Sequence, residues 1–114
     1  MMQTFKIYVD DVRKCPDGYD AYCQSTNETL HLINRKYREG VRHFYLDLDN
    51  DTTLDLDGKN GGDFVNILKV LDNLIFNGHY KNVYFKIHIH TGNSVAREYM
   101  RLIINHNPYM EEIF

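Results

Sequence analysis

Residues 83–94 read Val-Tyr-Phe-Lys-Ile-His-Ile-His-Thr-Gly-Asn-Ser, and the change of pattern within this stretch decides the fold. Residues 83–89 are rich in β-branched and aromatic side chains, which predicts a strand. Polar residues follow at once, and a helix is expected to begin at Asn93 or Ser94 and to end before Pro108. A strand that leads directly into a helix is the repeating unit of α/β proteins.

The same unit recurs toward the N-terminus. Alternating strands and helices favour a mostly parallel sheet, here of four strands. The loop before residues 19–23 is short for a parallel crossover, so this strand is expected to lie at an edge or to be distorted. The other predicted strands cover residues 5–9 and 44–48, and the predicted helices run from the capping box at 25–28 to Gly40 and from Phe64 to Gly78.

The composition fits a single domain over residues 1–114, with 43% apolar residues and a net charge of −3. This charge excludes a general basic field, so we expect no extended nucleic-acid surface, and any contact with a nucleic acid should be local. No apolar run is long enough for a membrane span or a secretory signal. Cys15 and Cys23 form no paired motif and are expected to be packing residues, which favours a cytoplasmic protein.

Three of the predicted strands end in polar residues of consistent chemistry. Acidic residues follow the strands at 5–9 and 44–48, while histidine, threonine and asparagine follow or end the strand at 83–89. In open α/β sheets, ligands bind beyond the carboxyl ends of the strands. We therefore expect these side chains to share one cavity.

The acidic residues at these strand ends are the expected metal site. Carboxylates that lie close together repel one another unless a cation compensates their charge. Hard divalent cations take oxygen ligands and commonly bridge to a phosphate, which indicates Mg²⁺ or Mn²⁺. The alternative is that these carboxylates cap turns and helix starts. The expected metal ligands are Asp10, Asp11, Asp47 and Asp49.

His88 and His90 are the expected catalytic imidazoles, and Asp47 is the expected catalytic carboxylate. Residues two apart on a strand point to the same side, so the two histidines share a face. At the end of a strand this pair suits general acid–base chemistry or metal ligation, although two half-exposed histidines satisfied by their neighbours are the alternative. A phosphate would be held by nearby donors and by the start of the following helix. The expected phosphate-binding residues are Arg13, Thr91, Asn93 and Arg97.

Several motifs resemble those of the cyclic-phosphate processing receiver-like domain family. Residues 7–13, Ile-Tyr-Val-Asp-Asp-Val-Arg, resemble its opening, and residues 45–49, Tyr-Leu-Asp-Leu-Asp, resemble its third-strand Asp-His-Asp motif. Gly62 matches the glycine before its next helix. Residues 87–100 resemble its last and most specific motif, His-x-His-Ser-x-Asn-Pro-x-Gly-x-x-x-Met.

The resemblance implies a short receiver-like (flavodoxin-like) three-layer fold with a mostly parallel four-stranded sheet. It implies hydrolysis of a cyclic phosphate on a nucleotide or RNA end, in RNA processing. It also implies an acidic pocket supplemented by neutral donors, formed by Asp10, Asp11, Asp47, His88, His90, Thr91 and Asn93. The departures from the family motifs are Leu48 for histidine, Thr91 for serine, Ser94 for proline and Ala96 for glycine.

Three functions stay open from the sequence. The first is a metal-assisted phosphoesterase, in which the metal polarises the phosphoryl oxygens and His88 or His90 protonates the leaving oxygen. The second is a phosphate-accepting receiver domain for signalling, with Asp47 as the acceptor and Thr91 as the switch hydroxyl. The third is a nucleotide- or phosphate-binding module whose catalysis is weakened because Leu48 replaces the family histidine.

Overall fold

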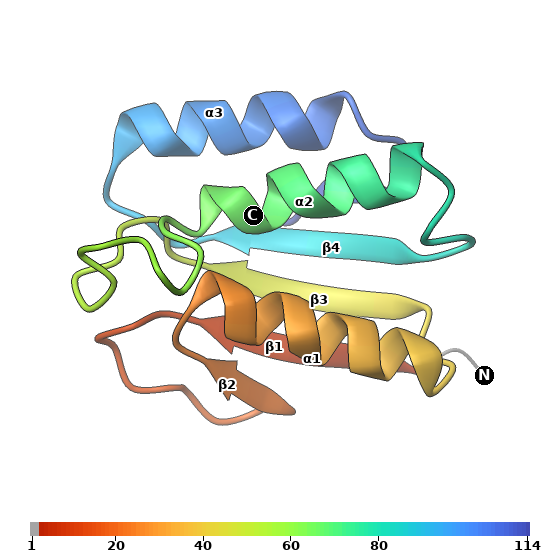
Figure 1. Cartoon of the computed structure of the whole chain (residues 1–114), viewed down its shortest axis with the longest axis horizontal. Helices are drawn as coiled ribbons and strands as arrows, with labels where there is room; N and C mark the ends of the chain where they lie inside the picture. Colours follow the sequence, from red (N-terminus) through yellow and green to blue (C-terminus); the bar gives the residue numbers. More distant parts are fainter. Residues whose placement is uncertain (1–2) are drawn as a thin grey trace.

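The computed structural model describes residues 3–114 and shows a fully parallel sheet with three helices (Figure 1). The strands pair in the order β2-β1-β3-β4-β5. Every neighbouring pair is parallel, so the predicted α/β class and parallel sheet are confirmed. The strands are β1 (Thr4–Val9), β2 (Ala21–Cys23), β3 (His43–Leu48), β4 (Tyr84–Ile89) and β5 (Met110–Glu112), and the helices are α1 (Thr26–Arg38), α2 (Val65–Phe76) and α3 (Ser94–Asn105).

The sheet has five strands rather than the four predicted. The fifth, β5, pairs with β4 at the far edge of the sheet. Its sequence, Met-Glu-Glu, has no β-branched or aromatic residue, so it carries no strand signal of its own. β2 is a short edge strand parallel to β1, and the link between them, residues 10–20, contains no helix. The short crossover is thus achieved by an irregular loop.

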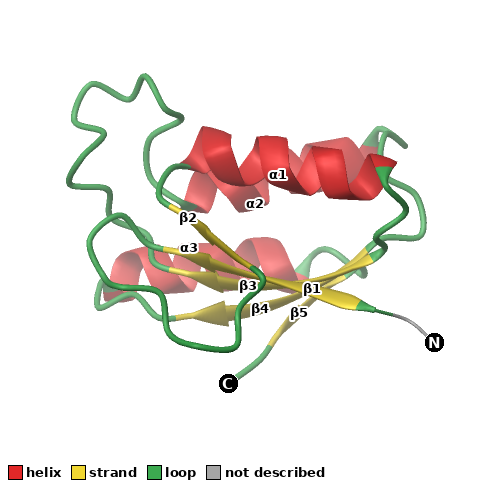
Figure 2. Ribbon diagram, turned by 90° about the horizontal axis from the view of Figure 1, so that it is seen from below, coloured by secondary structure: helices red, strands yellow, loops and turns green. Residues whose placement is uncertain are grey.

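Helices α1 and α2 lie above the sheet in Figure 2, and α3 packs on the same face, since its Met100 and Ile104 join the same core cluster. Helix α2 packs against both α1 and α3. One apolar cluster joins the helices to the alternate residues of the strands, such as Phe44, Leu46 and Leu48 on β3. The described residues therefore form two layers rather than the three expected. The third layer is absent because no helix connects β1 to β2 and none follows β5 within residues 3–114.

The helix starts follow local capping chemistry. Ser25 caps α1 by accepting a hydrogen bond from the N–H of Glu28, at 3.1 Å. The Glu28 carboxylate accepts from the N–H of Gln24 at 2.6 Å, one residue earlier than a regular capping box would place it. Within residues 3–114, no helix has the length and apolar character that crossing a bilayer requires.

The opposite side of the sheet carries the strand residues that alternate with the core residues, and we call it the open face. The pairing of the strands shows which residues belong to it. Ile7 of β1, Leu46 of β3 and Ile87 of β4 are paired neighbours that face the helices, so the residues next to them in sequence face the open side. The side chains of the open face are Thr4, Lys6, Tyr8, Tyr22, His43, Tyr45, Asp47, Tyr84, Lys86, His88 and Glu111.

Candidate functional site

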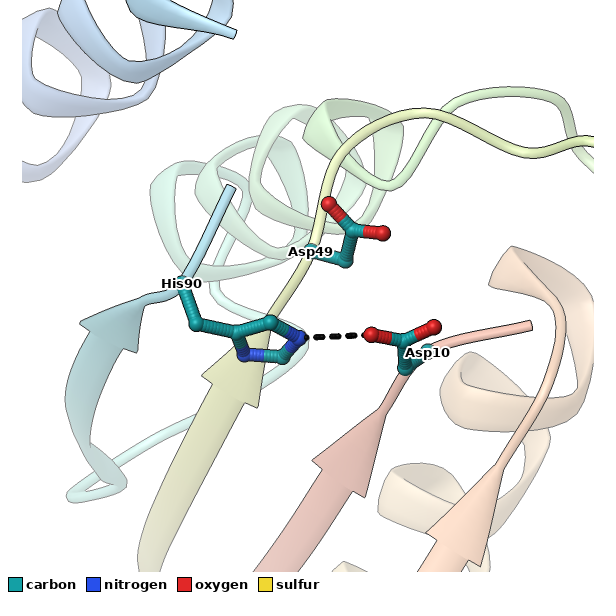
Figure 3. Close-up of side chains that lie close together, drawn as sticks. All are labelled: Asp10, Asp49 and His90. Atoms are coloured by element: carbon teal, nitrogen blue, oxygen red, sulfur yellow. Dashed lines mark hydrogen bonds and ion pairs between the residues drawn. The ribbon is translucent and has the colours of Figure 1, made fainter. Parts of the chain in front are cut away.

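Asp10, Asp49 and His90 come together at the carboxyl ends of three adjacent strands (Figure 3). Each is the first residue after its strand, β1, β3 and β4 respectively. One ligand atom from each side chain lies within 4.8 Å of the other two. The two carboxylates are buried and the imidazole is half-buried, so this small cluster of donors is largely shielded from water.

The imidazole of His90 lies between two carboxylates. Its Nε2 atom is 3.0 Å from Oδ2 of Asp10, and its Nδ1 atom is hydrogen-bonded to Asp47. Tyr8 stacks on the ring in parallel, with the centroids 5.0 Å apart. Burial opposes a charge on the ring, but the hydrogen bonds to Asp47 and Asp10 prevail and raise the pKa of His90 above its ordinary value. Without a cation, the two carboxylates therefore favour the protonated ring over the neutral one.

Asp47 uses both of its oxygens within the protein. Oδ1 contacts Nδ1 of His90, and Oδ2 accepts a hydrogen bond from the hydroxyl of Tyr19. Burial would raise the pKa of Asp47, but the hydrogen bonds from His90 and Tyr19 lower it below its ordinary value. Asp47 was also an expected metal ligand, but it is outside the cluster of potential ligands, because its carboxylate is bonded to His90 and Tyr19 on the open face.

Tyr19 is a site residue that the sequence analysis missed. It lies in the loop between β1 and β2, and no motif marks it. Burial and the negative charge of Asp47 raise the pKa of its phenol well above the ordinary value, so the hydroxyl stays a neutral donor.

The two carboxylates of the cluster have different electrostatic environments. Oδ1 of Asp10 accepts from the N–H groups of Val12 and Arg13, each at 2.9 Å. Burial would raise the pKa of Asp10, but these N–H groups and His90 lower it. Burial, together with the charge of Asp10, raises the pKa of Asp49, although the N–H of Asn50 opposes this. The protein therefore compensates the negative charge of Asp49 only in part.

Asp11 does not join the cluster, although it was an expected metal ligand. Its Oδ2 atom accepts hydrogen bonds from the N–H groups of Thr53 and Leu54, at 2.5 and 3.0 Å. Its other oxygen is buried without a hydrogen-bond partner among the described residues. Adjacent acids at a strand end point in different directions, and Asp11 holds the loop after β3.

His88 is also separated from the cluster. Its Nδ1 atom is 3.0 Å from the carbonyl oxygen of Ile113, so the ring is tied to the chain after β5. It is opposite Asp47 in the β3–β4 register. The shared face of the two histidines thus places both near Asp47, but the hydrogen bond to Asp47 goes to His90.

Of the four expected phosphate-binding residues, Arg13 is the most available. Its side chain is 55% exposed, its Nη1 donates to the carbonyl of His90 at 3.0 Å, and it lies 3.8 Å from Asp10. Asn93 instead caps α3 by accepting from the N–H of Ala96 at 3.0 Å.

The other two expected phosphate-binding residues also serve the backbone around α3. Thr91 is buried, and its hydroxyl accepts from the N–H of Asn93 at 3.1 Å. Arg97 donates to the carbonyl of Thr91 at 2.5 Å. Its Nε is buried without a partner among the described residues. Thr91, Asn93 and Arg97 therefore shape the start of α3 at the edge of the site.

A comparison with known protein families identifies the family of the chain. The family model for the cyclic-phosphate processing receiver domain matches residues 5–106, which include all three cluster residues. The chain belongs to this family. The resemblance of the sequence motifs is thereby confirmed. No curated protein and no solved structure matches the chain.

The donor set of this receiver-like domain fits a divalent cation. Two carboxylates and an imidazole supply hard oxygen ligands and one nitrogen ligand. Histidine ligands of metals commonly donate the other ring N–H to a carboxylate, which fixes the ring and raises its basicity. Asp47 is placed to do this for His90. A cation would also offset the burial and the repulsion by Asp10 that raise the pKa of Asp49.

The departure at Leu48 from the cyclic-phosphate processing receiver family does not fall in the cluster. Leu48 is fully buried in the apolar core on the helix side of β3, whereas Asp47 lies on the open face. The missing histidine therefore removes no donor from the group formed by Asp10, Asp49 and His90.

Proposed function

We propose that this receiver-like domain is a metal-assisted phosphoesterase that opens a cyclic phosphate on a nucleotide or RNA end. The observation that carries the proposal is the convergence of Asp10, Asp49 and His90, with His90 oriented by Asp47. The membership of the chain in the cyclic-phosphate processing receiver family supports the choice of substrate.

Asp10, Asp49 and His90 would hold the cation, with Mn²⁺ favoured over Mg²⁺ because one ligand is an imidazole. A divalent cation at such a site polarises the phosphoryl oxygens and lowers the pKa of water. Asp47 keeps the proton on Nδ1 of His90, so that Nε2 presents its lone pair to the cluster. Tyr19 fixes Asp47 from the other side.

The reaction adds water to phosphorus and breaks one of the two ring ester bonds. The leaving oxygen takes a proton, and the product is a phosphate monoester. Arg13 would hold the phosphate, since its guanidinium is exposed beside Asp10. His90 cannot use the same Nε2 atom as a ligand and as a proton donor, which leaves His88 as the imidazole for proton transfer. To reach the leaving oxygen, the His88 ring would have to give up its contact with the carbonyl oxygen of Ile113.

The geometry gives less support to the two other functions. As a phosphate acceptor, Asp47 would have to break hydrogen bonds at both oxygens, to His90 and Tyr19. Leu48, the residue that suggested a weakened binding module, lies in the core and not at the cluster. We therefore keep the phosphoesterase as the proposed function.

The test is hydrolysis of a 2′,3′-cyclic mononucleotide in the presence of Mn²⁺, followed by phosphorus NMR. We expect a monoester product that is not formed in EDTA. Asp49→Asn and His90→Gln should each lower the rate by roughly 100-fold or more, since each weakens or removes a proposed ligand of the cation. His88→Gln separates proton transfer from metal binding, because it should slow hydrolysis while Mn²⁺ still binds.

The matched control is Asp57→Asn, which removes an exposed carboxylate that bonds only within its own loop and to Lys59. This variant should hydrolyse the substrate at the wild-type rate. Full activity of Asp49→Asn, or failure of the wild-type protein to hydrolyse the cyclic phosphate, would show that the proposed function is wrong.

A further inference from the structure

The open face of the sheet has an unusual composition for a surface that no described helix covers. Its eleven strand positions hold four tyrosines and two histidines but no Ala, Val, Leu, Ile, Met or Phe. Two of its tyrosines, Tyr22 and Tyr84, are 37% and 43% exposed. Tyr8 is only 6% exposed and packs against Tyr19 and His90, so its ring is explained by packing. A solvated sheet face is normally polar, so the exposed rings need another explanation.

The rings are arranged in two groups along the strands. At the amino end of β3 and β4, His43 stacks on Tyr84 with the centroids 5.3 Å apart, and Tyr109 is 5.5 Å from Tyr84. These rings line a cavity of about 290 Å³ that Lys86 also borders. The aromatic side chains that line this cavity suit a flat aromatic ligand.

The second ring group lies closer to the metal-ligand cluster. The ammonium of Lys6 lies 5.0 Å from the ring centre of Tyr19 and 5.2 Å from that of Tyr45. Tyr19 also contacts Asp47, so this group is continuous with the candidate site. His43 and Asp47 are four residues apart on β3, so about 13 Å of strand separates the first ring group from the candidate site.

The composition distinguishes between two kinds of occupant. A protein helix packed on the sheet would need aliphatic side chains beneath it, and these positions have none. Nucleobases stack on tyrosine and histidine rings, and single strands are bound in this way with lysines near the backbone. The net charge of −3 excludes a long basic track, but stacking of a few bases needs only the two lysines, Lys6 and Lys86.

We propose that the open face is a stacking platform for the bases that precede the cyclic phosphate in a short single-stranded RNA. The inference rests on the proposed function for the phosphate end, and it makes an RNA 3′ end, rather than a free mononucleotide, the substrate class. A 2′,3′-cyclic phosphate requires a ribose 2′-hydroxyl, which selects RNA over DNA. The cavity at Tyr84 takes a base upstream of the reacting nucleotide.

The test measures binding separately from hydrolysis. The probe is a fluorescent RNA of about four nucleotides with a 3′-hydroxyl end, long enough to cover one stacking surface, and anisotropy reports its affinity. Tyr84→Ala should weaken binding about tenfold, the usual effect of removing one base-stacking ring, and Tyr84→Phe should keep it. Lys86→Glu, an exposed substitution that spares every ring, should also weaken binding and reduce its salt dependence, because one cation fewer lies near the RNA backbone.

Phe76→Ala is the matched control, since Phe76 is an aromatic residue on α2, 87% exposed and away from the open face. It should leave RNA binding unchanged. Tyr84→Ala should also lower kcat/KM for an RNA bearing a cyclic phosphate about tenfold more than for a cyclic mononucleotide.

Two results would overturn the platform. One is equal affinity of the wild-type protein for the RNA and a mononucleotide. The other is wild-type affinity of Tyr84→Ala for the RNA, whether or not this substitution changes the mass of the protein in solution. A change of mass without an effect on RNA binding would identify the face as a protein interface. RNA binding that depends on Tyr84, in a protein that hydrolyses no cyclic phosphate, would refute the proposed function and leave the platform standing.

Discussion

The Nδ1 atom of His90 is hydrogen-bonded to the carboxylate of Asp47, across the boundary between β4 and β3. This bond fixes the ring so that Nε2 points to Asp10, 3.0 Å away. Tyr8 packs flat against the ring and limits its rotation. The orientation of His90 is therefore set by the protein itself, before any cation or phosphate binds.

Asp47→Asn should weaken Mn²⁺ binding without unfolding the protein. The amide can still accept a hydrogen bond from Nδ1 of His90, but it loses the charge that makes the ring a stronger ligand. Loss of such an outer carboxylate typically lowers metal affinity about 10–100-fold. Isothermal titration with Mn²⁺ measures this directly. Wild-type affinity in Asp47→Asn would show that Asp47 does not tune His90.

Asp49→Asn should have opposite effects on the metal-free and metal-bound proteins. Burial and the charge of Asp10 raise the pKa of Asp49, so its ionised form at neutral pH disfavours the folded state. The variant should therefore be as stable as the wild-type protein in EDTA, or more stable. It should lose the rise in melting temperature, about 5–15 °C, that saturating Mn²⁺ gives the wild-type protein.

Thermal unfolding in EDTA and in Mn²⁺ provides the comparison for Asp49→Asn. Asp57→Asn is again the control, because that carboxylate is 61% exposed and lies outside the cluster. It should keep the full Mn²⁺-dependent shift. A shift of wild-type size in Asp49→Asn would remove Asp49 from the metal site.

The regular elements near the site were largely predictable because their side-chain periods are strong. Residues 44–48 and 83–89 were expected as strands, and the structure has them at His43–Leu48 and Tyr84–Ile89. Strand β5 was not predictable, because its Met-Glu-Glu sequence pairs through the position of its backbone beside β4 and not through its side chains.

The individual roles of the site residues were less predictable than their location. Asp10 and Asp11 are neighbours in sequence, yet only Asp10 reaches His90, since the chain turns directly after β1. Tyr19 reaches Asp47 across 28 residues of sequence, a contact that no local pattern encodes. The alternation of side chains along a strand predicted that His88 and His90 share a face. It did not predict which histidine bonds Asp47: His88 contacts the carbonyl oxygen of Ile113, and His90, just beyond β4, bonds Asp47.

The metal-free protein should lose stability as the pH rises above neutrality. Hydrogen bonds to Asp47 and Asp10 outweigh burial and raise the pKa of His90, so its contribution is fully present below about pH 6.5 and is lost as the pH rises through the folded pKa. The lowered pKa values of Asp10 and Asp47 give a contribution that is present above about pH 3.9 and is lost as the pH falls.

Urea unfolding in EDTA at about pH 5.5 and about pH 8.5 tests this dependence. The free energy of unfolding should be higher at the lower pH, and His90→Gln should reduce the difference. Comparing the two proteins removes most of the contribution of groups other than His90. An identical pH dependence in His90→Gln would mean that His90 is not the titrating group.

Gly61→Ala should destabilise the loop that connects β3 to α2. Gly61 has a φ of +103°, and a Cβ there would lie 2.7 Å from Oδ1 of Asn27 and 2.8 Å from Cβ of Thr26. The loop is fixed to the start of α1 at this point, since Thr26 donates to the carbonyl of Gly62 at 3.0 Å. The substitution must therefore push the loop away from α1.

The matched variant is Gly58→Ala, in the same loop, where φ is also positive, at +71°, but no atom lies within 4 Å of the added Cβ. Gly58→Ala should cost about 1–2 kcal/mol of unfolding free energy from backbone strain alone. Gly61→Ala should cost a further 1–3 kcal/mol, approximately, from the steric overlap. Chemical denaturation measures both. Equal losses would mean that Gly61 is required only for its backbone angle. Close contact with α1 would then not be what holds this loop, which also contacts Asp11 through the N–H of Thr53.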